Sequence, residues 1–193
     1  TLQGSVRTDS AVGSTTEQRL KEQYGIFAAA SQGKAQLITI ENNLMKVKVS
    51  TLGGKIYSVE LKGYKRYNGE PLILFEGDAN RFGLNFSSQN KSIQTDQFYF
   101  TPSTADTVIS IVGAPVDKGK EGREKFNAGV KEGEKSLTMS LKAEEGVAVE
   151  YVYSLSHNSY MVGFNIRTTG LKKVMVANSD YINFSWTQAM PRL

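Results

Sequence analysis

Apolar and polar residues alternate along most of the chain from Gln36 onward. A period of two is typical of β-strands that bury one face and expose the other to water. The apolar positions that set this period are Met45/Val47/Val49, Tyr57/Val59/Leu61, Leu72–Phe75, Phe82/Leu84/Phe86, Phe98–Phe100, Val108–Val112, Leu137/Met139/Leu141, Val147/Val149/Tyr151/Tyr153/Leu155, Val162/Phe164/Ile166, Val174/Val176 and Ile182/Phe184/Trp186. Each of these runs predicts a short strand with one buried face.

Short turn signals separate the predicted strands. They are Gly53-Gly54, Asn68-Gly69, Glu145-Gly146, His157-Asn158-Ser159 and Thr169-Gly170, and glycine and asparagine favour tight reversals of the chain. A parallel α/β fold needs a helix between successive strands, and these connections are too short or too rich in glycine to supply one. The pattern predicts an all-β fold, an antiparallel β-sandwich of about ten to twelve short strands.

The N-terminal region has a different pattern. The first 13 residues are polar and contain glycine, so residues 1–13 are expected to form a flexible arm. Ser14-Thr15-Thr16-Glu17 has the spacing of a capping box, with serine at the N-cap and glutamate at N3. Leu20, Tyr24 and Phe27 follow at helical intervals, which predicts one short helix over about residues 15–30. The sandwich domain, with this helix, is expected to span residues 14–193.

The ends and the charge of the chain add two expectations. The chain begins Thr-Leu-Gln and has no initiator methionine, signal peptide or membrane-spanning apolar run, so we expect a fragment of a longer polypeptide. Basic residues outnumber acidic ones by 23 to 19, a formal net charge of +4, which is too small an excess to indicate a nucleic-acid partner. Asp117–Lys135 is densely charged, but its opposite charges nearly cancel, which is typical of a solvated hairpin loop.

The residue types exclude several kinds of catalytic site. With no cysteine and a single histidine, the chain cannot build a thiolate metal site, a cysteine nucleophile or a site with two imidazoles. That histidine, His157, falls in a predicted turn, where a side chain is expected to be solvated, whereas a general base must be held by an orienting partner near its substrate. The carboxylates that could pair for glycoside chemistry lie on predicted polar faces or in loops: Glu60, Glu70, Glu76, Asp78 and Asp96. We therefore expect no catalytic residue, no cofactor, no metal site and no enzymatic activity.

Three aromatic side chains are candidates for contact with a partner. In Phe98-Tyr99-Phe100 the two phenylalanines share one strand face and Tyr99 takes the other, which places Tyr99 outside the core. Phe184 and Trp186 belong to an apolar stripe on the last predicted strand. An unpaired strand with such a stripe invites edge-to-edge association, so we expect weak self-association through residues 180–187 or shielding of this strand by the N-terminal arm and helix.

An ordered set of segments carries a family resemblance: Tyr24–Ala30, Gln32–Lys34, Ile40–Asn42, Ser50–Ile56, Leu61–Lys62 with Tyr64, Pro71–Phe75 and Arg81–Phe86. This set resembles the beginning of the large periplasmic domain of the YidC membrane-protein insertases of Gram-negative bacteria. The resemblance is clear over about Tyr24 to Phe86 and rests on the strand pattern alone after that. It points to the N-terminal part of that domain.

The resemblance implies a β-supersandwich similar to galactose-mutarotase-like sugar-binding domains, at the periplasmic face of the inner membrane. It implies a non-catalytic domain that supports insertion and folding of membrane proteins. The implied partners are the secretion translocon, its accessory subunits and nascent membrane proteins. The family's membrane helices and insertase groove have no counterpart in this chain, so no insertion residue is carried over. The alternative is a carbohydrate-binding or mutarotase-like domain, in which His157 would act with a glutamate on a pyranose.

Overall fold

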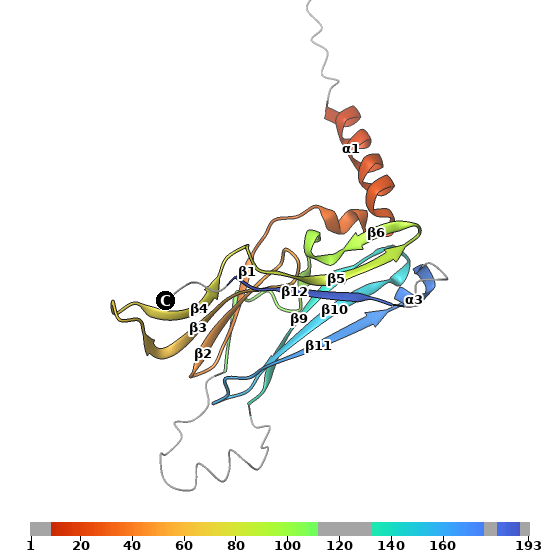
Figure 1. Cartoon of the computed structure of the whole chain (residues 1–193). Coiled ribbons are helices and arrows are strands. Elements are labelled where there is room, and N and C mark those ends of the chain that lie inside the picture. The colour runs from red at the N-terminus through yellow and green to blue at the C-terminus, as the bar shows by residue number, and fades with distance from the viewer. Residues whose placement is uncertain (1–8, 112–132, 176–180, 190–193) are drawn as a thin grey trace, which may run out of the picture.

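The computed structural model describes residues 9–111, 133–175 and 181–189. Within these ranges the chain is made mainly of strands (Figure 1). The strands are β1 (Leu37–Glu41), β2 (Met45–Ser50), β3 (Ile56–Lys65), β4 (Pro71–Glu76), β5 (Arg81–Ser88), β6 (Lys91–Gln94), β7 (Thr101–Pro102), β8 (Val108–Ser110), β9 (Lys135–Lys142), β10 (Ala148–Leu155), β11 (Val162–Thr169) and β12 (Asn183–Thr187). The helices are α1 (Asp9–Tyr24), α3 (Leu171–Val174) and the 3-10 helices η1 (Gly25–Ser31), η2 (Thr95–Gln97) and η3 (Glu144–Gly146).

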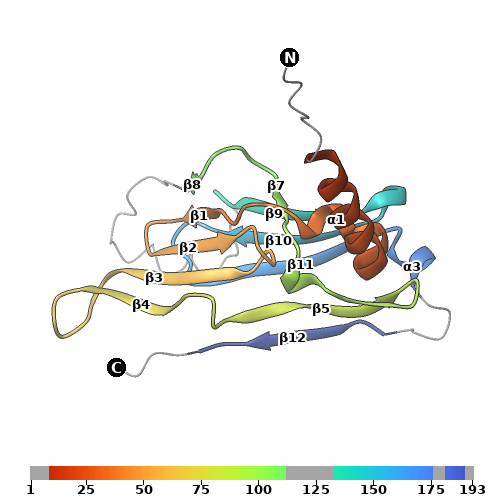
Figure 2. The same cartoon turned by 90° about the horizontal axis from the view of Figure 1, so that it is seen from above.

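The strands form three sheets. Their orders are β4-β3-β2-β1-β8, β11-β10-β9-β7 and β12-β5-β6. The pairings are antiparallel except for β8, which lies parallel to β1. β4 leads into β5, so the first and third sheets follow one another along one side of the molecule, as Figure 2 shows. The prediction of an all-β, antiparallel-rich sandwich is confirmed.

One core lies between these sheets. β10 shows most clearly why the alternating sequence folds this way: Val149, Tyr151, Tyr153 and Leu155 are buried almost completely, while the residues between them are only partly covered. The buried faces of β2, β5 and β9 belong to the same apolar cluster. The apolar residues at every second position of the sequence thus lie on the inner face of each layer.

The predicted N-terminal helix is present, but it begins earlier than expected. α1 starts at Asp9, so Ser14 lies inside the helix and the predicted capping box is wrong. The α-helix ends at Tyr24 because Gly25 has a left-handed backbone, with φ of 58°. The chain then continues as η1, which buries Phe27 against the sheets. No helix in the described ranges combines the length and apolarity needed to cross a membrane.

Two predicted strands differ in the structure. Val174 lies in α3, because Gly170 reverses the chain in a left-handed conformation and Leu171 and Val174 are then buried at helical spacing; Val176 lies outside the described residues. Phe98–Phe100 forms a single bridge, from Tyr99 to Leu52, rather than a strand. Most of the predicted loop at 117–135, up to residue 132, is also outside the described residues.

Candidate functional site

Four aromatic side chains meet at one edge of the sandwich, and we call this group the aromatic seam: Phe82 of β5, Phe164 of β11, and Phe184 and Trp186 of β12. The Phe82 ring lies edge-on to the other three, with centroid distances of 5.0 Å to Phe164, 5.1 Å to Phe184 and 5.8 Å to Trp186. Phe164 and Phe184 are 6.4 Å apart. The seam thus joins a strand of the four-stranded sheet to two strands of the three-stranded sheet.

The strand register shows that these rings point inward. Phe184 pairs with Leu84 and Trp186 pairs with Phe82, and residues directly opposite each other in a sheet point to the same face. Leu84 and Phe82 are buried, so that face is the inner face of the layer. Yet Phe184 is 46% exposed and Trp186 is 59% exposed, and Phe164 on the facing layer is 38% exposed. The seam is therefore a part of the core that water reaches within this chain.

Two buried tyrosines form the floor of the seam. Tyr151 lies 5.4 Å from Phe82, and Tyr153 lies 5.2 Å from Phe164. The Tyr151 hydroxyl shares a 2.7 Å hydrogen bond with Thr95 Oγ1, and the Tyr153 hydroxyl donates to the Gly54 carbonyl at 2.6 Å. Burial raises the pKa of Tyr151 to about 12 and also raises the pKa of Tyr153 well above its ordinary value. Both hydroxyls stay protonated at neutral pH, so they hold the core together rather than act as bases.

Helix α1 does not cover the seam. It contacts η1 and β6, and β6 lies at the opposite edge of the three-stranded sheet from β12. The expectation that the N-terminal helix shields the last strand is therefore wrong for the helix; residues 1–8 of the arm lie outside the described residues. The reason is that Phe27 of η1 packs against Phe86 and Phe98, which fixes the helix near β6.

Tyr99 lies at a different place from Phe184 and Trp186. Phe98 and Phe100 are buried and Tyr99 is half-buried on the other side, as the alternation predicted. The Tyr99 ring packs on Gly33 so closely that a Cβ there would lie 2.6 Å from its Cγ. The shallow hollow around Tyr99 is lined from η1, the segment between η1 and β1, β7 and β9, with no residue of β12. The three predicted contact residues are thus divided between two surfaces.

The residues weighed for catalysis do not converge. His157 lies in the turn between β10 and β11, as predicted. Glu60, Glu76 and Asp78 each lie 3.5 Å from a lysine, and Asp96 lies in η2. In the described ranges no group of three histidine or acidic side chains could hold a metal ion.

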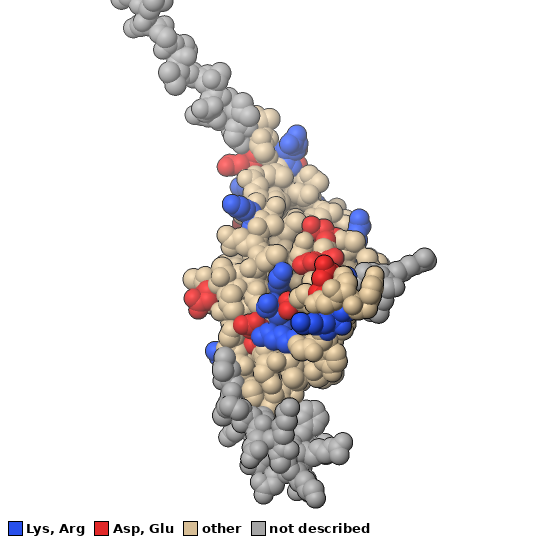
Figure 3. Space-filling view, turned by 90° about the vertical axis from the view of Figure 1, so that its left-hand side faces the viewer, with Lys and Arg blue, Asp and Glu red and all other residues tan. Residues whose placement is uncertain are grey.

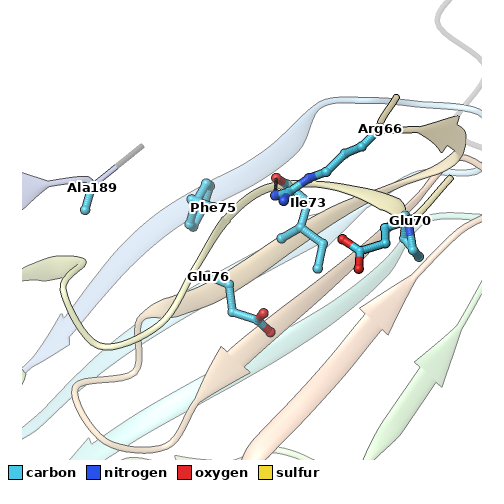
Figure 4. Close-up of a pocket in the computed structure, with 7 residues that line it drawn as sticks. Arg66, Glu70, Ile73, Phe75, Glu76 and Ala189 are labelled. Carbon is cyan, nitrogen blue, oxygen red and sulfur yellow. Dashed lines mark hydrogen bonds between the residues drawn. The ribbon is translucent and has the colours of Figure 1, made fainter. Parts of the chain in front are cut away.

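One hollow does contain two of the carboxylates. It has a volume of about 590 Å³ and lies beside β4, where Arg66, Glu70, Ile73 and Glu76 are among its lining residues (Figure 4). The Arg66 guanidinium donates to the Ile73 carbonyl at 3.5 Å, and Asn68 donates to the Glu70 carboxylate at 3.0 Å. Glu76 interacts with Lys48, so these groups take part in local ionic and hydrogen-bonding contacts rather than face one another as an acid and a base.

Charged side chains of both signs lie together on the face formed by β2, β3 and β4, as Figure 3 shows. Lys62 lies 3.0 Å from Glu41, and Lys46 lies 3.5 Å from Glu60. Ser110 donates to the Glu41 carboxylate at 2.7 Å, and this hydrogen bond lowers the pKa of Glu41 more than its partial burial raises it. The pairing of opposite charges across β1, β2 and β3 is typical of a solvated sheet face.

Two members of the seam, Phe82 and Phe164, were not singled out from the sequence. Their alternation places them correctly on inner faces, but an inner-face residue is normally buried. Only the pairing of the strands shows that β11 and β12 both end a sheet and that their inner faces meet at an open edge. The sequence contains no signal for that meeting.

Comparison with known proteins gives consistent matches along the chain. A family model described as the YidC periplasmic domain matches residues 37–192. A protein of Bacteroides fragilis named "Membrane protein insertase YidC" is 26% identical over 182 residues, which cover 94% of this chain and 25% of the relative. Proteins of the same name from Azobacteroides pseudotrichonymphae and Amoebophilus asiaticus are 32% identical over 166 residues and 39% identical over 95 residues. These stretches cover 86% and 49% of this chain, and 23% and 16% of the relatives. The chain thus spans about a quarter or less of the length of these relatives.

Proposed function

The chain belongs to the YidC periplasmic domain family, and from this we propose that it is a non-catalytic accessory domain of a membrane-protein insertase, on the periplasmic side of the inner membrane. It supports the insertion and folding of inner-membrane proteins. Its partners are the secretion translocon with its accessory subunits, and nascent membrane proteins. The observation that supports an accessory role is the arrangement of the acidic side chains: Glu60, Glu70 and Glu76 make local contacts and do not assemble an acid–base pair around a cleft.

Deletion of this segment from the insertase that carries it tests the accessory role. We expect membrane-protein insertion to continue at a reduced or unchanged rate, because the resemblance places the insertase groove in the family's membrane helices, and no helix in the residues that the structure describes could cross a membrane. The control is a measurement that the membrane core is still folded and present at its normal amount. Complete loss of insertion with an intact core would contradict the proposal.

Photoreactive residues test the proposed partners. Placed at Tyr99 in the membrane-bound protein, such a residue should crosslink to a translocon subunit or to a nascent chain, because Tyr99 is half-buried beside an open hollow. The matched control is Phe98, which is fully buried and should give no crosslink. Equal crosslinking at the two positions would contradict a role for Tyr99 as a contact residue.

The sugar-binding alternative makes a different prediction. A mutarotase-like site needs His157 and a glutamate to face one pyranose, and His157 lies in a turn at the end of β10. We therefore expect no saturable change in melting temperature when monosaccharides are added. A saturable shift that disappears in His157→Ala would favour the alternative over the accessory role.

A further inference from the structure

The hollow around Tyr99 has charged side chains of one sign. It has a volume of about 420 Å³, and among the described residues the charged side chains that line it are those of Lys34 and Lys142. Its other polar side chains are neutral and include Gln32 and Gln36. Three other hollows of the described residues, by contrast, each contain charges of both signs. A hollow lined by positive charge alone attracts anionic groups.

The polar side chains of this hollow take no part in holding the fold together. Within the described ranges, no hydrogen bond or ion pair involves the ammonium groups of Lys34 and Lys142. The same is true of the side-chain amides of Gln32 and Gln36. The ion pairs elsewhere in these ranges involve lysines in or next to β2 and β3. Two ammonium groups and two amides are thus available to a ligand that carries both carboxylates and peptide groups.

Backbone hydrogen bonds fix the wall of the hollow. The Tyr99 N–H donates to the Ala30 carbonyl at 2.8 Å, and the Phe100 N–H donates to the Thr51 carbonyl at 2.8 Å. The Thr51 N–H in turn donates to the Gln36 carbonyl at 2.9 Å, which holds the segment that leads into β1. The Tyr99 ring therefore has a set place in the wall. A site that is already formed before binding loses less entropy when a ligand enters.

From these observations we infer that the hollow around Tyr99 binds acidic polypeptide segments, namely those that nascent membrane proteins present on the periplasmic side. Carboxylates of such a segment pair with Lys34 and Lys142. Its peptide groups form hydrogen bonds with the glutamine amides, and its chain lies against the Tyr99 ring. An inorganic anion would use the two lysines but neither the amides nor the ring. The inference rests on the proposed function and narrows one of its partners to a class of segment.

The distribution of charge in membrane proteins supports nascent chains as the source of the segment. Loops that stay in the cytoplasm carry an excess of lysine and arginine, so the loops that cross the membrane are poor in these residues. A hollow with two lysines repels few of the translocated loops and attracts those that are acidic. Charge complementarity therefore favours a translocated loop over a cytoplasmic type of sequence.

A photoreactive residue at Thr101 of the complete membrane-bound insertase tests the inference. Thr101 is exposed and lines the hollow, so this change leaves Tyr99 and both lysines in place. The probes are two versions of one model membrane protein, whose translocated loop carries either aspartate and glutamate or the matching asparagine and glutamine. The acidic loop should crosslink more strongly than the neutral loop, and the difference should shrink as the salt concentration rises.

Two pairs of lysine substitutions provide matched variants. Lys34→Gln combined with Lys142→Gln should reduce crosslinking of the acidic loop by about 2- to 30-fold, the range expected for the loss of two exposed ion pairs. The control combines Lys172→Gln with Lys173→Gln. It removes the same charge from α3, which does not line the hollow, and should leave crosslinking unchanged.

The possible failures differ from one another. Equal crosslinking of the acidic and neutral loops, or equal effects of the two pairs of substitutions, would overturn the inference. Crosslinks that form only with a translocon subunit would overturn nascent chains as the occupant. None of these results bears on the accessory role, which is tested separately by the rate of insertion after the segment is deleted.

Discussion

Gly54 lies in a turn against the buried Tyr151 ring, and its replacement by alanine should destabilise the domain more than an ordinary turn substitution. Its backbone is left-handed, with φ of 61°, and a Cβ at this position would lie 2.9 Å from Tyr151 Cδ2 and 3.0 Å from Phe100 Cδ1. Both rings are buried, so moving either one aside would disturb a close-packed core. Its carbonyl also accepts the hydrogen bond from Tyr153. The substitution therefore combines backbone strain with overpacking.

A control variant separates the two contributions to the expected loss of stability. The left-handed conformation costs a non-glycine residue about 1–2 kcal/mol, and overpacking of a core costs about 1–3 kcal/mol more. Gly69 is also left-handed, with φ of 84°, but a Cβ there meets nothing within 4 Å. Gly69→Ala should thus lose only the backbone part, and Gly54→Ala should lose about 2–5 kcal/mol of the free energy of unfolding, a large part of the roughly 5–15 kcal/mol typical of a domain.

Urea unfolding followed by far-ultraviolet circular dichroism measures both variants. The midpoint should fall much further for Gly54→Ala than for Gly69→Ala, with similar slopes if the unfolded states are equally exposed. Equal losses of stability in the two variants would refute the reasoning, since they would show that the buried rings move aside without cost.

Three further predictions follow from other contacts. The isolated chain should associate weakly as its concentration rises. Phe184→Ser should reduce the association seen by light scattering, while Tyr67→Ser, at an exposed aromatic far from β12 in the sequence, should not. A monomer at every concentration would contradict association through the edge of β12. Ser110 lowers the pKa of Glu41, so the ionised Glu41 carboxylate contributes stability at pH values above its ordinary pKa of 4.5. This contribution is lost as pH falls through the lower pKa of the folded state. Ser110→Ala should flatten this acid dependence of the free energy of unfolding, and an unchanged pH profile would contradict the prediction. Phe27→Ala should lower the free energy of unfolding by about 3–5 kcal/mol, because it removes a fully buried ring, and a small change in urea midpoint would show that η1 is not part of the core.

The sequence predicts which face of each strand is buried better than it predicts which strands lie next to each other. Tyr151 and Tyr153 take every second position of a run in which Glu150 and Ser154 lie on the other face, and this pattern predicts their burial; the same holds for Phe98 and Phe100 around Tyr99. Alternation does not indicate which strands lie next to each other, so no feature of the sequence predicts the parallel pairing of β8 with β1. For the same reason the seam could not be predicted, because a residue's exposure at a sheet edge depends on whether the next strand is present.

The helix start and the strand at residue 174 were missed for local reasons. Ser14 and Glu17 have the right spacing for a cap, but the same residues are also compatible with a helix interior, so the motif does not fix the first residue. Val174 has a valine's preference for strands, which is overridden once Leu171 and Val174 share one buried helical face. Both errors arise where tertiary packing decides between two locally acceptable conformations.

The parallel pairing of β1 with β8 has a consequence for the order in which the domain can fold during synthesis. The hydrogen bond from Ser110 to Glu41 joins residues 69 positions apart, so β1 has only β2 beside it until that whole stretch has emerged. Loops of this length close slowly compared with hairpins. During synthesis the outer edge of β1 is therefore open for as long as the ribosome needs to add those residues, on the order of seconds at about 5–20 residues per second. The five-stranded sheet, although it is built from early parts of the chain, is completed only by a strand from the second half.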